Sequence, residues 1–239
     1  MASPSRIAII PARGGSRRLP RKNVVAFLGR PILAWTVIAA QESGLFDRVV
    51  VSTEDDEIAS VARDAGAAVA DRPAALAGDL ATVLDVCLDL LDREEAGGRA
   101  WDVVCALYAT APLRNAGDIR AVVELLEPGR CDFAMAVTEY DLPPYRALRQ
   151  DGDGTLVPMW PDLVARKSQD MPPLVVNNGS TYAVHVPALR QHRTFTGPGC
   201  RGHLMPRARS VDIDVAEDLE TALWHAQRLG LAAGAPAVG

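Results

Sequence analysis

The stretch RIAIIPARGGSRRLPRKN, residues 6–23, joins an apolar run to a basic loop that contains two glycines. The apolar run is typical of a buried β-strand. Gly14 and Gly15 allow positive φ and a close approach of the backbone, so that their N–H groups can converge on an anion. The surrounding cations are Arg13, Arg17, Arg18, Arg21 and Lys22, with no acidic residue among them. In an open parallel sheet, the loop after the first strand is the usual position for a phosphate.

The rest of the chain continues this pattern, because apolar runs alternate with segments of helical period. Strands are predicted over 6–10, 48–53, 67–70, 102–110 and 132–140, with helices over 32–43, 57–66, 81–95 and 116–127. Further strands are expected over 175–186 and 208–214, followed by a last helix near 215–230. Fully apolar strands that alternate with helices indicate a parallel sheet covered on both faces. We therefore predict an open, doubly wound, mostly parallel α/β fold, Rossmann-like in architecture.

One segment breaks the alternation. Residues 141–173 combine prolines, a DGDG turn and short strand-like pieces, which indicates a hairpin excursion from the main sheet. We expect this excursion to be a lid or a subunit contact. The chain length favours a single domain over 1–231, and the tail over 232–239 is expected to be disordered.

Composition and charge narrow the class of protein. Apolar residues make up 49% and charged residues 23%, as in an ordinary globular protein. No apolar stretch is long enough to cross a bilayer, and no signal peptide is recognisable, so we expect a cytoplasmic protein without membrane association. The four cysteines and four histidines show no metal-ligand spacing.

The charge is unevenly distributed along the chain. The net charge of −5 argues against a general nucleic-acid binder, yet the first 41 residues carry seven Lys or Arg and no Asp or Glu. A local positive field on an acidic protein favours a small anionic ligand. The alternative is a solvated basic loop, which a charge run alone would favour.

The basic loop matches neither GxxxxGK[ST] nor GxGxxG, which excludes the common NTPase and dinucleotide-binding interpretations. The string PARGGSxRxPRKN instead resembles the first motif of the CMP-sialic acid synthetase family, the acylneuraminate cytidylyltransferases. Three later segments resemble that family in the same order: VVVSTEDDEIASVARDAGA, DRPAALAGDLAT and SVDIDVAEDLE. The resemblance therefore covers essentially the whole chain.

Within that family, two segments resemble the pseudaminic acid branch. They are YATAPLR (108–114) and ARKSQDMPP (165–173). The segment NNGSTYAV (177–184) is closer to the form found in sialic and legionaminic acid enzymes, which leaves the sugar open. The resemblance implies a reaction of CTP with a nine-carbon α-keto acid sugar to give the CMP-sugar and pyrophosphate. It also implies a homodimer whose inserted hairpin reaches the neighbouring subunit.

The resemblance assigns roles in the nucleotide site. Arg13, Ser16, Arg21 and Lys22 are expected to contact the triphosphate, with backbone contributions from Gly14 and Gly15 and with Asn23 fixing the loop. Ala12, Arg72, Asp79 and Thr82 fall in the segments expected to recognise the base. Asp79 is equally a candidate helix cap.

A pair of carboxylates near the end of the chain is the candidate metal site. Asp212 and Asp214 are two positions apart on an expected strand, so their side chains point to the same face. Two carboxylates there repel each other unless a cation lies between them, and Mg²⁺ takes oxygen ligands. A solvated acidic strand end is the competing interpretation. With Arg13 and Lys22, these two aspartates form the predicted catalytic set.

The sugar acid has its own candidates. Arg166 offers a two-pronged match to a carboxylate, and Gln169 can serve hydroxyl or N-acyl groups. Tyr108, Thr110 and Asn178 are expected at strand ends that face the same cleft. No general base is identifiable from the sequence.

Other functions stay open at the level of sequence. CMP transfer to sialic or legionaminic acid, to another acidic sugar or to a phosphonate would use the same machinery. A sugar 1-phosphate nucleotidyltransferase and a nucleotide-binding module without turnover are the remaining alternatives.

Overall fold

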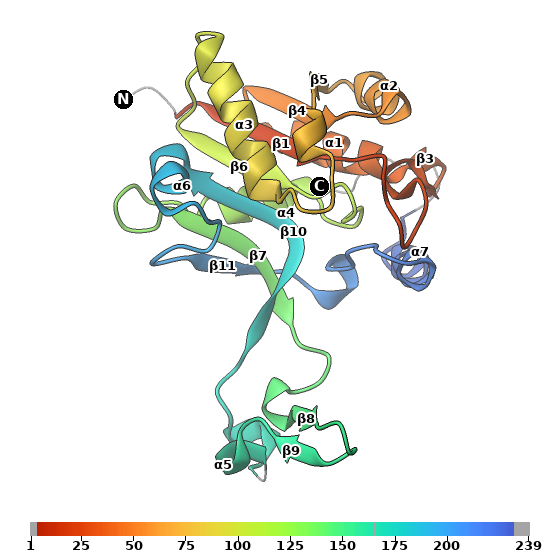
Figure 1. The fold of residues 1–239 in the computed structure, drawn as a ribbon, viewed down its shortest axis with the longest axis vertical. Helices are drawn as coiled ribbons and strands as arrows, with labels where there is room; N and C mark the ends of the chain where they lie inside the picture. The colour runs from red at the N-terminus through yellow and green to blue at the C-terminus, as the bar shows by residue number, and fades with distance from the viewer. Residues whose placement is uncertain (1–3, 165, 232–239) are drawn as a thin grey trace.

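A seven-stranded sheet forms the centre of the molecule (Figure 1). The structure is a computed structural model, and it describes residues 4–164 and 166–231. The strand order is β11-β7-β10-β6-β1-β4-β5. The strands are β1 (Arg6–Pro11), β4 (Arg48–Thr53), β5 (Ala68–Asp71), β6 (Val103–Leu107), β7 (Phe133–Glu139), β10 (Val175–His185) and β11 (Arg201–Leu204). Only β10 runs antiparallel to its neighbours. The prediction of a mostly parallel sheet is confirmed.

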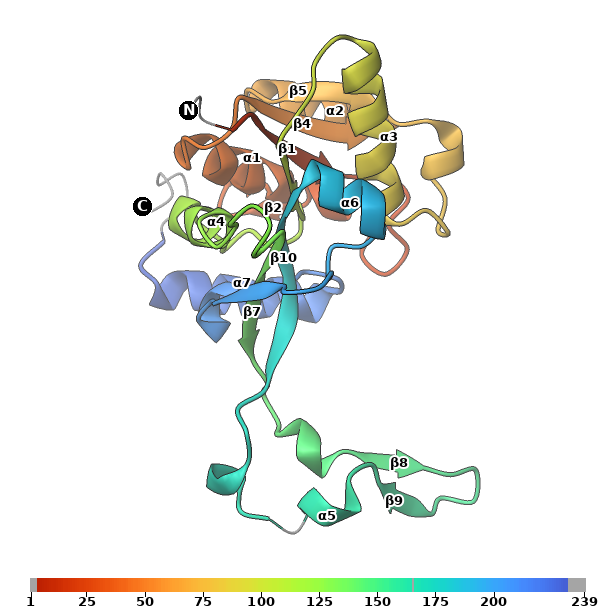
Figure 2. The ribbon, with the colours of Figure 1, turned by 90° about the vertical axis from the view of Figure 1, so that its left-hand side faces the viewer.

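Helices cover both faces of this sheet, as Figure 2 shows. Along β1 the side chains alternate: Ile7 and Ile9 pack towards α3 (Val83–Ala96) and α6 (Val186–His192), whereas Ala8 and Ile10 pack on the opposite face. That face is covered by α1 (Ile32–Glu42), α2 (Asp56–Asp64) and α4 (Ala116–Val123). The buried strands explain the apolar runs of the sequence, and the doubly wound arrangement is confirmed.

A third apolar cluster attaches the C-terminal helix α7 (Ala216–Arg228) to the body. It joins α7 to α1 and to the small ribbon of β2 (Ala26–Phe27) and β3 (Arg30–Pro31), which follows the basic loop. Ile213 is completely buried in this cluster. The segment between β11 and α7 therefore returns to the side of the molecule that carries the basic loop.

The helix starts near the basic loop use side-chain caps. Asp55 accepts a hydrogen bond from the backbone N–H of Ile58 at the start of α2. Thr82 and Asp85 form a capping box at the start of α3, and Asn115 and Asp118 form one at the start of α4. Each box satisfies N–H groups that would otherwise lack partners.

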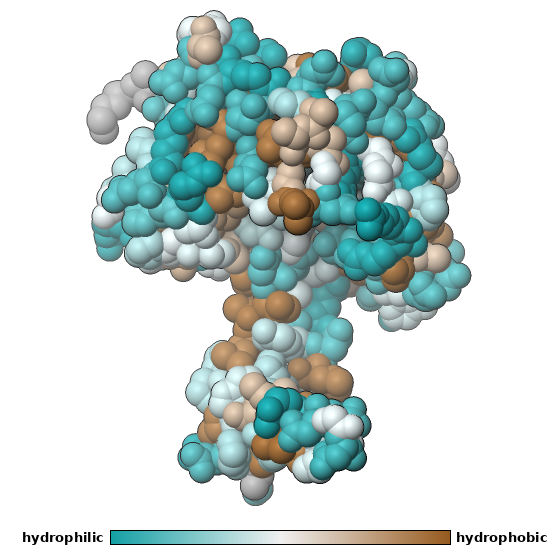
Figure 3. All heavy atoms as spheres, in the orientation of Figure 1, coloured by the Kyte–Doolittle hydropathy of each residue, from teal (hydrophilic) through white to brown (hydrophobic). Residues whose placement is uncertain are grey.

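Residues 140–174 leave the body between β7 and β10 as a projecting arm, visible in Figures 1 and 2. The arm contains a hairpin of β8 (Leu148–Gln150) and β9 (Leu156–Pro158), the short helix α5 (Pro161–Val164) and the 3₁₀ turns η3 (Pro144–Arg146) and η4 (Ser168–Asp170). The predicted hairpin excursion is confirmed. The arm and its base expose eight large apolar side chains: Tyr140, Leu142, Leu148, Leu156, Met159, Trp160, Leu174 and Val175. Figure 3 shows hydrophobic residues where the arm joins the body.

Some expected elements differ from the structure. The strand predicted over 208–214 is wrong, because the chain forms the 3₁₀ turn η5 (Arg207–Arg209) and then runs extended outside the sheet. The predicted helix over 116–127 ends at Val123, since Glu127 forms a β-bridge with Cys131. The turn η1 (Lys22–Val24) closes the basic loop, and η2 (Ala74–Leu76) follows β5. The predicted tail over 232–239 lies outside the described residues.

The cysteines are unpaired: Cys87, Cys105 and Cys131 are buried and Cys200 is half-buried. Within residues 4–164 and 166–231, no helix is long and apolar enough to cross a membrane.

Candidate active site

A cavity of about 500 Å³ opens at the carboxyl ends of β1 and β6. Its walls come from five parts of the sequence: the basic loop, Arg72 after β5, the residues at the start of α3, the residues after β6, and the segment before α7. The polar lining residues are Arg13, Ser16, Arg17, Arg18, Lys22, Asn23, Arg72, Asp79, Thr82, Tyr108, Thr110 and Asp214. Ten residues predicted for the site therefore meet around one cavity, whereas Ala12, Gly14, Gly15, Arg21, Arg166, Gln169, Asn178 and Asp212 do not line it.

Backbone contacts hold the basic loop beside the sheet. The N–H of Ala12 donates to the carbonyl of Ser52 at 3.0 Å, which extends the pairing of β1 with β4. Asn23 is buried, and its side-chain amide donates to the carbonyl of Arg13 at 2.8 Å. A Cβ at Gly14 would lie 2.5 Å from a carboxylate oxygen of Asp55, so glycine is required there for packing. Asn23 thus fixes the basic loop through its hydrogen bond to Arg13.

The cations of the loop are neutralised by carboxylates from other parts of the chain. The carboxylate of Asp79 forms ion pairs with Arg13 Nη1 at 2.8 Å and with Arg17 Nη2 at 2.7 Å. Asp214 accepts from Arg18 at 2.7 Å and from Lys22 at 2.6 Å. The N–H of Gly14 donates to Glu54 at 2.7 Å. These acidic groups occupy the donors that an incoming phosphate would use, so a triphosphate must replace them.

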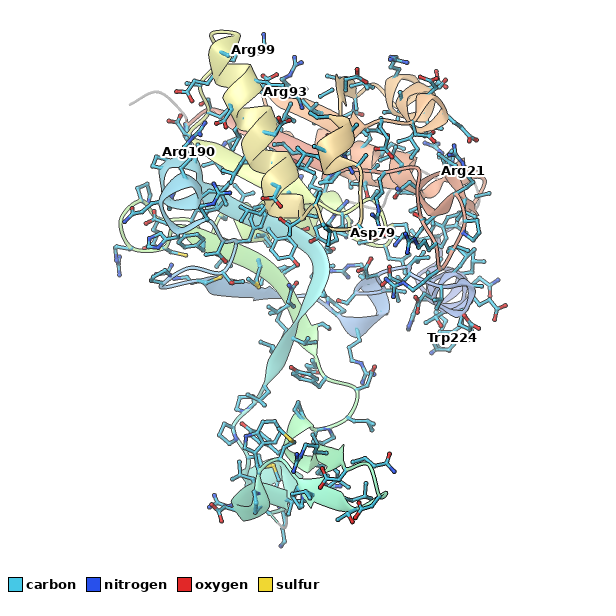
Figure 4. All side chains as sticks on the ribbon, viewed as in Figure 1. Arg21, Asp79, Arg93, Arg99, Arg190 and Trp224 are labelled. Carbon is cyan, nitrogen blue, oxygen red and sulfur yellow. The ribbon has the colours of Figure 1, made fainter. Side chains whose placement is uncertain are left out.

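Arg21 is turned away from the cavity. Its backbone has a φ of 56°, and its guanidinium binds Asp55 at 2.5 and 3.0 Å and also contacts Glu57. The hydrogen bond from Arg21 lowers the pKa of Asp55 to about 2. Figure 4 shows Arg21 apart from Asp79, on the side of the body near β3. Arg21 therefore joins the loop to the start of α2 and does not reach the predicted phosphate position in this structure.

The segment predicted to read the base contributes a buried cation. Arg72 is 7% exposed, and its Nη2 donates to the carbonyl of Ser52 at 2.7 Å. Burial lowers the pKa of Arg72, and Glu54 lies 3.9 Å from its Nε. The alternative role of Asp79 as a helix cap is wrong, because Thr82 caps α3. Thr82 also lines the cavity, so it combines a structural role with a place in the wall.

The two aspartates have different surroundings. Asp212 accepts a short hydrogen bond from the hydroxyl of Thr110, and burial raises its pKa. Burial also raises the pKa of Asp214, but the hydrogen bonds and charges of Lys22 and Arg18 outweigh it, so that pKa lies below its ordinary value. The extended segment places buried Ile213 between them, while the N–H of Ile213 donates to the carbonyl of Thr110 at 2.9 Å.

The donor set beside Thr110 fits a hard divalent cation. It consists of carboxylate and hydroxyl oxygens, which Mg²⁺ prefers. Asp212 is half-buried near the carboxylate of Asp214 and forms no ion pair within residues 4–164 and 166–231, so a metal would offset its charge. No group of three or more His, Cys, Asp or Glu side chains gathers for a metal within the described chain.

The residues predicted to bind the sugar acid lie in two different parts of the structure, the body and the arm. Tyr108 and Thr110 line the cavity at the end of β6. Arg166 and Gln169 are exposed and belong to the projecting arm, away from the cavity of their own chain. Asn178 is buried and contacts Met205 and Ser210, so it supports the wall and does not face the cavity.

Tyr108, which lines the cavity, packs against a second tyrosine, Tyr182. The rings of Tyr108 and Tyr182 lie 5.5 Å apart, and Phe195 lies 5.4 Å from Tyr182 on the other side. Asn177 donates to the hydroxyl of Tyr182 at 2.6 Å. Burial raises the pKa of Tyr108, so its hydroxyl stays protonated at neutral pH.

Sequence reasoning missed the acidic partners of the loop. Glu54 and Asp55 directly follow β4, whose carboxyl end lies beside that of β1, and this placement is the signal that predicts their proximity to the loop. Arg17 and Arg18 are cations of the basic loop to which the sequence assigned no separate role. Both line the cavity.

Comparison with known proteins places the chain in a family. The profile of the cytidylyltransferase family matches residues 7–143, which is more than half of the chain. The chain belongs to the cytidylyltransferase family. It is a nucleotidyltransferase by that membership, and the resemblance seen in the basic loop is confirmed.

Two relatives cover most of this cytidylyltransferase. Pseudaminic acid cytidylyltransferase of Campylobacter jejuni is 34% identical over 217 residues, which cover 90% of this chain and 94% of the relative. The CMP-N,N'-diacetyllegionaminic acid synthase of Legionella pneumophila is 32% identical over 217 residues, covering 89% of this chain and 92% of the relative.

Solved structures support the fold. A CMP:2-keto-3-deoxy-manno-octonic acid synthetase complexed with CTP has a TM-score of 0.69 at 15% identity, covering 95% of this chain and 99% of that one. The 4-diphosphocytidyl-2C-methyl-D-erythritol synthase of Anaerococcus prevotii has a TM-score of 0.62 at 11% identity, covering 94% and 99%. The cytidylyltransferase thus shares its architecture with distant nucleotidyltransferases.

Proposed function

We propose that this cytidylyltransferase transfers CMP from CTP to a nonulosonic acid, with pseudaminic acid as the first candidate, and releases pyrophosphate. The observation that carries the proposal is the meeting of the basic loop and the aspartate segment across one cavity, where Lys22 Nζ lies 2.6 Å from Asp214 Oδ1. The relatives named for pseudaminic and legionaminic acid support the substrate class.

The loop cations suit the charge of a triphosphate. In the reaction, the anomeric hydroxyl attacks the α-phosphorus, and the bond from that phosphorus to the pyrophosphate oxygen breaks. Arg13, Arg17 and Lys22 line the cavity and neutralise the phosphate oxygens once Asp79 and Asp214 release them. Release of these ion pairs is coupled to nucleotide binding, because each cation exchanges one anionic partner for another.

We propose that Asp212 and Asp214 hold Mg²⁺ together with the nucleotide. When bound, the ion supplies charge neutralisation at the phosphate oxygens. Thr110 orients the carboxylate of Asp212 by donating its hydroxyl proton. Tyr108 stays protonated and is a donor in the cavity wall, so it is suited to bind an acceptor atom of the sugar and not to remove a proton. No histidine lines the cavity in the described part of the chain.

We propose a homodimer for the free protein. The arm and its base expose eight large apolar side chains, an arrangement that favours burial against a second copy of the chain. Arg166 and Gln169 lie on the same arm. In the dimer, Arg166 of the partner subunit would reach the cavity and bind the carboxylate of the sugar acid through its two-pronged guanidinium. Cytoplasmic location stays a prediction from the sequence.

The assignment is tested by mass spectrometry of the products. The enzyme is incubated with CTP, Mg²⁺ and a panel of nonulosonic acids: pseudaminic, legionaminic and sialic. We expect CMP-pseudaminic acid and equimolar pyrophosphate, with weaker or no product from the others. Product from legionaminic acid alone would transfer the proposal to that second candidate, which the 32% identical relative favours. No CMP-sugar from any acid would overturn it.

A further inference from the structure

The segment that carries Asp212 and Asp214 is joined to other elements by backbone hydrogen bonds near its two ends, from Met205 to Val137 at 2.8 Å and from Ile213 to Thr110 at 2.9 Å. Between Met205 and Val215 the chain leaves β11, makes the turn η5 and runs extended without joining the sheet. Carboxylates that bind an ion must be held in place by their surroundings, because small displacements weaken binding. Between these two backbone bonds, side chains from other elements hold the turn.

Arg209 makes the strongest of these contacts. Its Nη2 donates to Asp118 Oδ1 at 2.7 Å and its Nε donates to Asp118 Oδ2 at 3.0 Å, so both carboxylate oxygens are bound. Asp118 is 2% exposed and also accepts from the backbone N–H of Asn115 at the start of α4. His203 Nε2 lies 3.6 Å from the same carboxylate. A two-pronged pair with a buried carboxylate fixes distance and direction together.

Asn178 makes a second contact with the turn, at Ser210, the residue after Arg209. Its Oδ1 accepts from the N–H of Ser180 at 3.1 Å and from the Ser180 hydroxyl at 2.8 Å. These bonds orient the amide, so its Nδ2 donates to the hydroxyl of Ser210 at 3.1 Å. Ser210 in turn donates to the carbonyl of Pro206 at 3.0 Å. The turn before Asp212 is therefore held by β10 as well as by α4.

The backbone next to Asn178 forms the surface against which Asp212 rests. Gly179 has a φ of 69°, and a Cβ at this position would lie 2.8 Å from Asp212 Oδ2. The pairing of β10 with β7 shifts register between Asn177 and Tyr182, which places this glycine in a bulge. Thr110 contacts the other oxygen of Asp212. The carboxylate is thus confined between Gly179 of β10 and Thr110, which follows β6.

We propose that Arg209 and Asn178 are positioning residues for the aspartate pair: they hold the turn before Asp212 so that its carboxylate stays beside Thr110. Neither residue lines the cavity, so they act on the ligand only through Asp212. The inference rests on the proposed function, since the aspartate pair is taken to bind a divalent cation with CTP. It also reassigns Asn178, which the sequence suggested as a sugar contact.

The test is the binding of Mn²⁺, a spectroscopic substitute for Mg²⁺, in the presence of CTP and without sugar. Arg209→Lys keeps a positive charge beside Asp118 but loses the two-pronged geometry, and Asn178→Ala removes the second contact. We expect each variant to bind Mn²⁺ about 10-fold more weakly by electron paramagnetic resonance, while CTP binding without metal is unchanged. Ser210→Ala should give a smaller loss in the same direction.

The matched control is Arg201→Lys. Arg201 pairs with Glu127 at 3.1 Å on β11, before the turn, and lies outside the cavity lining. This control should bind Mn²⁺ like the wild type. Wild-type Mn²⁺ affinity in Arg209→Lys and Asn178→Ala would overturn the proposal, as would an equal loss in the Arg201 control. If one variant fails to fold, Ser210→Ala decides the question.

The binding measurement separates this inference from the proposed function. A protein that forms no CMP-sugar with any nonulosonic acid, yet loses Mn²⁺ affinity in the two variants, would refute the acceptor and keep the positioning role. A wild-type protein that binds no Mn²⁺ with CTP would overturn the positioning role itself.

Discussion

At the scale of single residues, the basic loop divides its cations between two tasks. Lys22 lines the cavity with a side chain that is 17% exposed, and its amine lies 2.6 Å from Asp214, so it meets the aspartate segment directly. Arg21 precedes it by one residue and yet binds Asp55 and Glu57 on the outer side. Adjacent positions of one motif therefore carry different physical roles.

Replacing Lys22 by Met should impair the reaction with CTP. The substitution keeps the length of the side chain but removes the charge that faces Asp214 and the phosphates. Loss of one such group typically lowers kcat by about 100-fold to 1,000-fold. Steady-state kinetics with varied CTP measures the effect. Activity close to that of the wild type would show that Lys22 is only a counter-ion of Asp214.

Arg21→Met, by contrast, should destabilise the fold and leave CTP kinetics nearly unchanged. The substitution removes the pairs with Asp55 and Glu57, which connect the loop to α2. We expect a lower midpoint of thermal unfolding and a KM for CTP close to the wild-type value. A large rise of that KM with no change in unfolding would contradict this assignment. It would mean that Arg21 turns towards the phosphates when CTP binds.

At the scale of elements, the start of α2 links stability to pH. The pKa of Asp55 is lowered to about 2 by the hydrogen bond from Arg21, below its usual value of 3.8. A carboxylate with a depressed pKa stabilises the fold above its unfolded pKa, and this contribution is lost as pH falls through the folded value. The native state should therefore lose this stability between about pH 4 and pH 2.

Asp55→Asn tests that contribution with little other change, because asparagine caps helices as well as aspartate does. Urea unfolding followed at several pH values should show a smaller loss of stability below pH 4 for the variant than for the wild type. Equal pH dependence of the two proteins would rule out a contribution from Asp55. Glu57 shares Arg21, so part of the dependence should remain in the variant.

The sequence predicted most elements because burial leaves a clear pattern. The run over 48–53 coincides with β4, whose last four residues are buried. The run over 208–214 instead alternates apolar and acidic residues at its end, yet it forms no strand, because its apolar position Ile213 packs against α1 and α7 and not in the sheet. Alternation reports which side chains are buried, but not the element that covers them.

The site was predictable to the extent that it depends on loops after strands. The basic loop and the residues after β6 fall at one sheet edge, so Lys22, Tyr108 and Thr110 meet at the cavity. The orientation of Arg21 depends on a positive φ and on acidic partners more than 30 residues away in sequence, as the separation of 34 from Asp55 shows. The buried position of Asn178 depends on the bulge in β10. Neither feature leaves a local signal.

At the scale of the whole molecule, the arm and the cavity belong to separate parts of one chain. Arg166 and Gln169, two of the residues predicted to bind the sugar acid, lie on the arm, whereas Tyr108 and Thr110 lie in the body. A homodimer with exchanged arms would unite the two sets, with each active site built from both subunits. This arrangement can be distinguished from a site completed within one chain by mixing two inactive variants.

Lys22→Met has a defective cavity and an intact arm, while Arg166→Ala has an intact cavity and a defective arm. In a dimer of one variant with the other, the intact cavity would receive the intact arm only if arms are exchanged. Random pairing of equal amounts gives half mixed dimers with one working site in two, so unfolding and refolding the mixture should restore about a quarter of wild-type activity. Each variant alone, treated in the same way, should stay inactive. A mixture that gains nothing, although light scattering shows dimers, would place Arg166 outside the partner's site.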